Sequence, residues 1–148
     1  MKRIFFIFIL LMVTACSKSD YRARKKIVIR PVKKTIIISI NFDFDKSDIR
    51  AVDQGKLDKF ISKLESLRGN IGIEGHTDTW GNYSYNDELS FRRAVATKEY
   101  LEKTMNPDHY DIQISGRGEY DSLVEEKTTL DMLKNRRVKI TFKENFKM

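Results

Sequence analysis

The chain has 148 residues, enough for one domain with a hydrophobic core but short for two. Its formal net charge of +7 is concentrated near the N-terminus, because residues 17–34 carry eight basic residues and one acidic residue. From Thr35 onward there are eighteen basic and twenty acidic residues, a net charge of −2. A nucleic-acid-binding domain needs its basic residues on the folded surface, so this distribution argues against a nucleic-acid partner.

Residues 1–15 have the pattern of an export signal. Lys2 and Arg3 precede ten apolar residues, Ile4 to Val13, and the small residues Thr14 and Ala15 follow. Ten apolar residues are too few to span a bilayer as a helix. A short buried helix is the alternative, but two positive charges at its start disfavour it. We therefore expect a signal peptide.

Cys16 is the only cysteine, and it comes directly after this signal. The stretch Val13-Thr14-Ala15-Cys16 resembles the bacterial lipobox, whose cysteine becomes the lipidated N-terminus carrying acyl chains such as palmitate. Residues 16–34 would then be a lipidated cysteine followed by a basic tether. The tether could contact anionic lipid headgroups or simply be solvated. Ser17 in place of aspartate after the cysteine favours the outer membrane.

The first half of the domain predicts a strand, a helix and a second strand. Residues 35–42 form a β-branched run that is apolar on both faces, which predicts an internal strand. Ser47 or Asp48 offers a helix cap. Apolar residues at three- and four-residue spacing then predict an amphipathic helix that ends near Gly69. Residues 70–75 alternate as a strand, and residues 27–29 could form a short strand of their own.

The second half predicts a helix over residues 86–103 and a strand over residues 111–115. A short helix over residues 128–133 and a last strand containing Val138, Ile140 and Phe142 follow. The fold class is therefore α/β (α+β), with helices stacked on one face of a mixed sheet of about four strands.

Helical periodicity separates the two adjacent arginines of the second predicted helix. With Leu89 at zero and 100° per residue, Arg93 falls within the core-facing arc, whereas Arg92 falls beside Glu88 on the solvent side. An inward arginine needs a partner, because an unpaired buried charge costs several kcal/mol. That partner is either a ligand or a buried carboxylate.

Acidic and basic residues occur where the other elements end. Asp78 follows the second strand, and Asp43 and Asp45 follow the first, so these carboxylates would converge if the two strands are parallel neighbours. Arg136 shares parity with the apolar residues of the last strand and should point inward, whereas Arg137 points the other way.

Several motifs together resemble the OmpA-like peptidoglycan-binding domain, the module of peptidoglycan-associated lipoproteins. The motifs are Phe42 to Asp48 (FDFDKSD), Gly75 to Asp78 (GHTD), Tyr85-Asn86, Leu89-Ser90, Arg93-Ala94, Gly116 to Glu119 and Asn135 to Val138. The resemblance covers residues 35–143 and leaves residues 144–148 as a tail. It implies a βαβαβ(α)β fold. Trp80 departs from the family pattern, which usually has a small or polar residue at this loop position.

The resemblance also implies a function. Family members bind the diaminopimelate of peptidoglycan stem peptides without catalysis, so the chain would link the outer membrane to the cell wall from the periplasmic side. Asp78 would bind the diaminopimelate amine and Arg93 its carboxylate. The remaining pocket residues would be Phe44, Asp45, Asn86, Leu89 and Arg136. No cofactor or metal is implied.

Two other functions stay open at this stage. Asp45 and Asp78 could form the carboxylate pair of a peptidoglycan hydrolase. The domain could also bind other envelope proteins, as lipoproteins of this type do. The only histidines are His76 and His109, too few for a zinc site beside Asp78, and we expect His76 to bond the neighbouring loop.

Overall fold

The structure is a computed structural model, and it describes residues 33–145. The predicted signal peptide, Cys16, nearly all of the tether and the possible strand at residues 27–29 lie outside the described residues. Within the described part the elements are β1 (Thr35–Asn41), α1 (Ala51–Ser62), β2 (Gly69–Gly75), α2 (Tyr83–Thr104), the 3-10 turn η1 (Pro107–His109), β3 (Tyr110–Gly116), α3 (Thr129–Asn135) and β4 (Arg137–Glu144).

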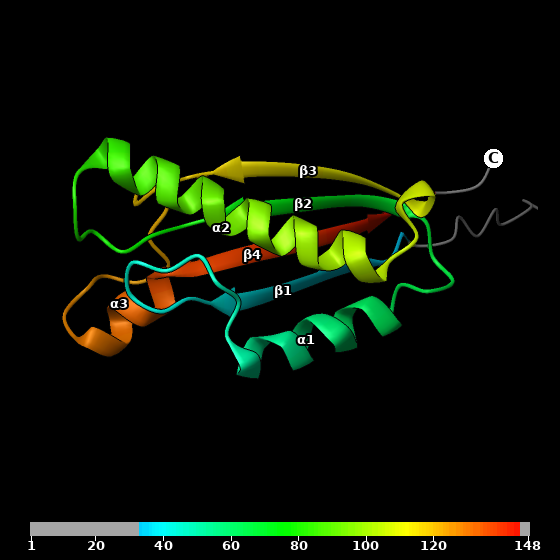
Figure 1. The fold of residues 1–148 in the computed structure, drawn as a ribbon, viewed down its shortest axis with the longest axis horizontal. Coiled ribbons are helices and arrows are strands. Elements are labelled where there is room, and N and C mark those ends of the chain that lie inside the picture. Colours follow the sequence, from blue (N-terminus) through cyan, green and yellow to red (C-terminus); the bar gives the residue numbers. More distant parts are fainter. Residues whose placement is uncertain (1–32, 146–148) are drawn as a thin grey trace, which may run out of the picture. The chain divides into compact units, whose positions relative to one another are not determined.

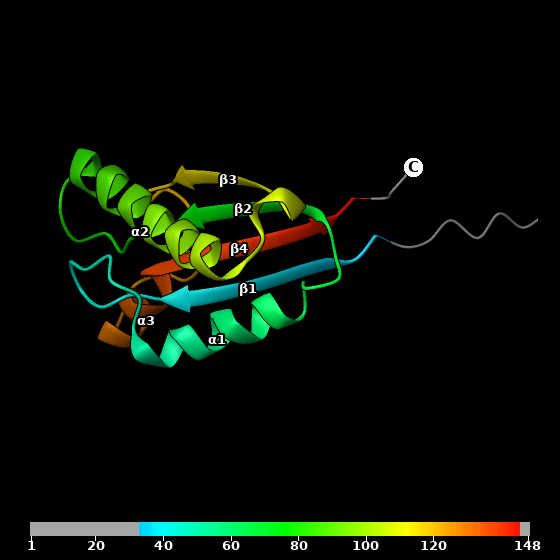
Figure 2. The same cartoon turned by 45° about the vertical axis from the view of Figure 1, so that its right-hand side comes forward.

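The four strands form one mixed sheet in the order β1-β4-β2-β3. β4 pairs antiparallel with both β1 and β2, and β2 pairs parallel with β3. α1 and α2 cover one face of this sheet, and α3 lies beyond its end near β1 and β4 (Figures 1 and 2). The predicted fold class is confirmed.

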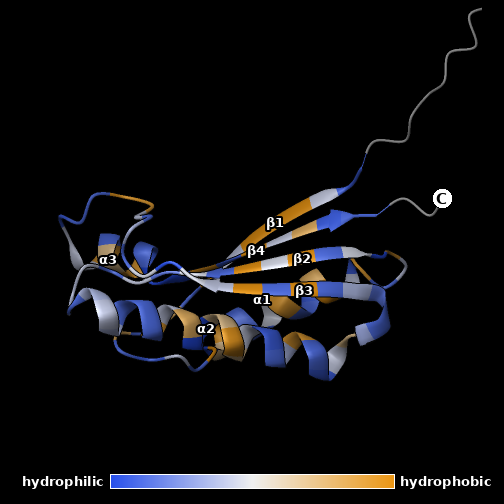
Figure 3. Ribbon diagram, turned by 90° about the horizontal axis from the view of Figure 1, so that it is seen from above, coloured by the Kyte–Doolittle hydropathy of each residue, from blue (hydrophilic) through white to orange (hydrophobic). Residues whose placement is uncertain are grey.

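The hydrophobic core lies between the sheet and the two long helices. Figure 3 shows the helices on one side of the sheet only. Val138, Ile140 and Phe142 of β4 are fully buried and belong to one core cluster with Leu57 and Phe60 of α1. Burying side chains of this size contributes about 1.5–3 kcal/mol each, so this layer provides the main driving force for folding.

One prediction about β1 is wrong. It is an edge strand rather than an internal one, and Ile37 on its open face is 59% exposed. β1 and β2 are not neighbours, which was the condition for their carboxylates to converge, because β4 lies between them. Since both are antiparallel to β4, they still run in the same direction, and their C-terminal ends reach the same edge of the sheet.

Both long helices begin and end elsewhere than predicted. α1 is preceded by Arg50 rather than capped by Ser47 or Asp48, and it ends at Ser62 before a series of turns that carries the apolar spacing onward. α2 starts one turn early, because the side chain of Asn82 accepts a hydrogen bond from the backbone N–H of Tyr85 at 2.9 Å. Such a cap satisfies a free N–H of the first turn.

Candidate ligand-binding site

Three segments meet at the edge of the sheet where β1 and β2 end. They are the loop after β1, the loop after β2 and the first three turns of α2. A pocket of about 180 Å³ opens among them, lined by Phe44, Asp45, Asp78, Trp80, Gly81, Tyr85 and Leu89. The structure therefore brings four of the seven predicted site residues to the pocket wall.

Asp78 forms the central ion pair of this region. Its Oδ2 accepts a hydrogen bond from Nη1 of Arg136 at 2.8 Å, and both side chains are less than 10% exposed. Arg136 also donates from Nε to the carbonyl of Phe42 at 3.3 Å. No described residue bonds to Oδ1 of Asp78, which leaves this oxygen available to a donor in the pocket.

Arg93 is completely buried, as helical periodicity predicted, and it lies against the Phe42 ring. Its side chain donates to three backbone carbonyls: Nε to Lys46 at 2.8 Å, Nη1 to His76 at 2.9 Å and Nη2 to Asp43 at 3.2 Å. Its hydrogen-bond acceptors are therefore carbonyls of two loops, not the buried carboxylate of the sequence-based alternative.

Burial lowers the pKa of Arg93 to about 10, and the nearby Asp78 carboxylate partly offsets this effect. The guanidinium is therefore charged at neutral pH. Three of its five N–H groups hold the loops, which leaves two, and the fully buried side chain does not itself line the pocket. Together, Arg93 and Arg136 supply two buried positive charges near one carboxylate.

Arg92, which is rotated by 100° from Arg93 around the helix, forms a surface pair with Glu88 at 2.6 Å. This confirms its predicted position on the solvent side.

Asn86 does not line the pocket but contacts its wall. Its Nδ2 donates to Glu119 Oε2 at 2.6 Å and to the carbonyl of Asp78 at 3.4 Å. Its Oδ1 is buried without a partner and lies near Gly81, a pocket residue with φ of 111°. An unsatisfied buried acceptor costs about 1–3 kcal/mol, so a ligand donor reaching Oδ1 would recover that free energy.

Aromatic side chains form the rim of the pocket. Phe44 and Trp80 meet edge to face with ring centroids 6.0 Å apart, and both are more than half exposed. The Tyr85 hydroxyl donates to Asp45, whose backbone has the left-handed φ of 54°. This bond raises the pKa of Tyr85. Sequence reasoning noted Trp80 as unusual but assigned no pocket role to Trp80, Gly81 or Tyr85.

A loop held by Asn135 places Arg136. The Asn135 side chain is fully buried and accepts from the backbone N–H groups of Leu123 and Val124 at 2.8 and 3.1 Å. Its Nδ2 donates to Glu126, which in turn accepts from the backbone and hydroxyl of Thr79. This network ties the loop after β2 to the start of β4. Long-range contacts of this kind leave no periodic signal in the sequence.

One prediction needs correction, and one arginine is more buried than expected. Arg137 is as buried as Arg136, and its Nη2 donates to the Asp121 carbonyl at 2.9 Å. The ring of His76 does not bond the neighbouring loop, since neither ring nitrogen has a hydrogen-bond partner within residues 33–145. Its backbone N–H donates to Arg137 instead. Burial lowers the pKa of His76 to about 4.

No cluster of three or more metal-ligating side chains occurs within residues 33–145. Over the same residues, no helix is both long and apolar enough to cross a membrane.

Comparison with known proteins identifies the family of this chain. The OmpA family matches residues 41–136, and the chain belongs to that family. It is 35% identical over 101 residues to outer membrane protein A of Bordetella avium, covering 67% of the chain and 51% of the relative. It is 32% identical over 104 residues to outer membrane porin F of Pseudomonas aeruginosa, covering 68% and 29%. The chain thus matches about half or less of the length of these relatives.

Solved structures share the fold. The peptidoglycan-associated lipoprotein of Burkholderia pseudomallei superposes with a TM-score of 0.59 at 21% identity, covering 70% of this chain and 88% of that one. The cell wall anchor of the T6SS from Pseudomonas aeruginosa gives 0.63 at 22% identity, covering 75% and 82%. The C-terminal domain of Helicobacter pylori MotB gives 0.59 at 24% identity, covering 71% and 83%.

Proposed function

We propose that this protein binds the diaminopimelate of peptidoglycan stem peptides without catalysis and so links the outer membrane to the cell wall. The observation that carries the proposal is the pocket beside Asp78, in which one carboxylate oxygen is unpaired and two buried guanidiniums lie close by. Membership of the OmpA family supports it, as do fold neighbours described as a peptidoglycan-associated lipoprotein and a cell wall anchor.

The ligand's chemistry matches this arrangement. A diaminopimelate side chain ends in an amine and a carboxylate on one carbon. The amine would donate to Oδ1 of Asp78 and to the unpaired Oδ1 of Asn86. The carboxylate would accept from the remaining N–H groups of Arg93, with Arg136 holding Asp78 in place. Arginine suits this role because its planar group can donate two parallel hydrogen bonds.

The pocket walls would select the stem by shape. Leu89 and the exposed ring of Phe44 offer apolar surface to the methylene chain of diaminopimelate. Asp45 would complete the acidic side of the pocket, with its carboxylate oriented by the Tyr85 hydroxyl.

The decisive experiment compares soluble stem peptides that differ only in the third residue. A lysine stem lacks the carboxylate, which would leave the two remaining N–H groups of Arg93 without an acceptor, so we expect it to bind more weakly by about 2–5 kcal/mol in calorimetric titration. Asp78→Asn should abolish binding to diaminopimelate stems, and the matched change Asp108→Asn, on the exposed turn η1, should not. Equal affinity for both stems would refute the assignment. Circular dichroism of each variant separates loss of binding from loss of folding.

The lipid anchor is part of the same proposal. Acyl chains on Cys16 would confine the domain near the wall and raise its effective concentration, which allows a modest intrinsic affinity to suffice. A tether of eighteen residues reaches at most roughly 60 Å. A Cys16→Ser variant that still sediments with outer membranes would contradict the anchor.

A hydrolase is the second candidate, because Asp45 and Asp78 both line the pocket. Glycoside hydrolysis needs one carboxyl group to act as a general acid, and Asp78 is instead ion-paired with Arg136. Release of soluble fragments from purified peptidoglycan would favour the hydrolase over the binding protein. Binding of other envelope proteins is compatible with wall binding and would show as capture of defined partners by both wild type and Asp78→Asn.

A further inference from the structure

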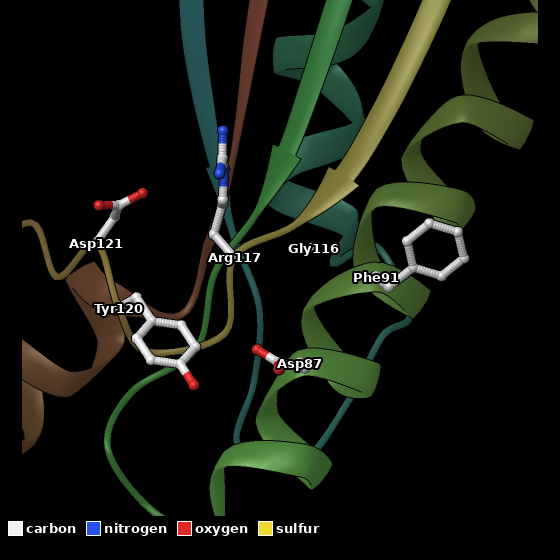
Figure 4. A pocket seen from close by; sticks show the side chains of 6 residues that line it. All are labelled: Asp87, Phe91, Gly116, Arg117, Tyr120 and Asp121. Atoms are coloured by element: carbon white, nitrogen blue, oxygen red, sulfur yellow. The ribbon is translucent and has the colours of Figure 1, made fainter.

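A second concave surface lies between α2 and the loop that follows β3. This groove has a volume of about 540 Å³ and is lined by Asp87, Phe91, Gly116, Arg117, Tyr120 and Asp121 (Figure 4). It shares no lining residue with the pocket beside Asp78. We refer to it as the α2–β3 groove.

Stacked tyrosines stand at one end of the groove. The rings of Tyr83 and Tyr120 lie 5.5 Å apart and within 15° of parallel, and the two residues are 60% and 66% exposed. Tyr83 and Asp87 are four residues apart, so they lie on the same side of α2. Exposed aromatic pairs of this kind are typical of binding surfaces, because the rings contribute contact area with little loss of side-chain entropy.

The loop that follows β3 forms the wall of the groove facing α2, and it approaches the helix closely. A Cβ atom added to Gly116 would lie 2.6 Å from the Ser90 hydroxyl, and one added to Gly118 would lie 2.5 Å from Oδ1 of Asp87. The backbone N–H of Gly118 donates to the Ser90 hydroxyl at 2.9 Å. These contacts fix the position of the loop relative to the helix, so the groove is preformed.

The charges in the groove have both signs. The carboxylates of Asp87 and Asp121 have no hydrogen-bond or ion-pair partner among residues 33–145, and Asp87 is directed toward the loop that carries Tyr120 (Figure 4). Arg117 also lines the groove, and within the same residues its only ionic contact is Glu74 at 3.9 Å. The groove therefore offers carboxylate acceptors and a guanidinium donor to a ligand rich in hydrogen-bonding groups.

We propose that the α2–β3 groove binds an N-acetylated saccharide. A pyranose ring presents C–H groups on one face, which are attracted to the negative face of an aromatic ring. Its hydroxyl and amide N–H groups would donate to Asp87 and Asp121, and its carbonyl oxygen would accept from Arg117.

This inference deepens the proposed function and rests on it for the biological source of the saccharide. Tyr85 and Leu89 face the stem pocket, while Asp87 and Phe91 face the groove, so both sites border the same turns of α2. A polymer that carries peptide stems on a glycan strand could occupy both sites at once. The groove would then add binding free energy from the glycan to that from the stem.

The test uses the full-length protein and the neutral tetrasaccharide of N-acetylglucosamine, which carries no peptide. NMR titration should shift the backbone signals of Asp87, Arg117 and Tyr120. Tyr120→Ala should weaken this binding about tenfold, whereas Tyr120→Phe, which keeps the ring, should stay within about twofold of wild type. Affinity for a soluble diaminopimelate stem peptide should be unchanged in both variants.

Each outcome bears on one site only. Absence of tetrasaccharide binding, shifts confined to the stem pocket, or equal binding by Tyr120→Ala would overturn the saccharide inference. Asp78→Asn should abolish binding to the stem peptide and retain the tetrasaccharide. If Asp78→Asn instead retains the stem, the proposed function fails while the saccharide site still stands.

Discussion

Replacing Arg93 with lysine tests whether this arginine holds the pocket together before any ligand arrives. Lysine keeps the positive charge but carries one compact ammonium in place of a planar fork. The arginine now joins the carbonyls of Asp43 and Lys46, after β1, to that of His76, after β2. A lysine could retain one of these three contacts, so two carbonyls would lose a charged donor.

The expected loss follows from those contacts. A hydrogen bond to a charged group contributes about 1.5–3 kcal/mol, and part of this would be recovered by water because Asp43 and Lys46 are exposed. We therefore expect Arg93→Lys to lower the free energy of unfolding by about 3 kcal/mol. That is a large share of the roughly 5–15 kcal/mol available to a typical domain.

Urea unfolding followed by circular dichroism measures this change. Arg92→Lys is the matched control, because the neighbouring arginine holds no backbone carbonyl among the described residues and forms a surface pair with Glu88 and a contact over the Tyr85 ring. Pairs of that kind contribute about 0.3–0.5 kcal/mol. A loss below about 1 kcal/mol in Arg93→Lys, or equal losses in both variants, would refute the role of Arg93 as a link between the two loops.

Two further predictions concern packing and pH. Gly75→Ala would place a Cβ 1.9 Å from the Ser90 carbonyl oxygen, and it should destabilise the fold by about 3 kcal/mol or more in thermal unfolding. Gly72→Ala is the control: its Cβ would meet nothing within 4 Å, so the change should be nearly neutral. The pKa of His76 is lowered in the folded protein, so the unfolded chain binds a proton more readily. The free energy of unfolding should therefore fall as the pH drops from about 6.5 towards about 4. His76→Leu should flatten this decline between pH 7 and 5. A wild-type stability unchanged over that range would contradict the second prediction.

Periodic patterns in the sequence predicted most of the fold. The class of fold, the four strands and both long helices follow from apolar spacing, because one buried face imposes a repeat of two or 3.6 residues. The same reasoning distinguished Arg93 from Arg92, since a helix rotates 100° per residue. The sequence also predicted which carboxylates follow the strands, and Asp78 and Asp45 do reach one pocket.

Only the tertiary structure decided the order of the strands and the partners of the charged groups. β4 is last in the chain but lies between β1 and β2, and β1 is an edge strand despite its apolar sequence. The pairing of Asp78 with Arg136 joins residues 58 apart in the chain, and the loop held by Asn135 makes it possible. Such contacts depend on how separate elements pack, and local spacing cannot encode them. The sequence was enough to select Asp78, Arg93 and Arg136 as site residues. The packing of the sheet determined that Asp78 pairs with Arg136.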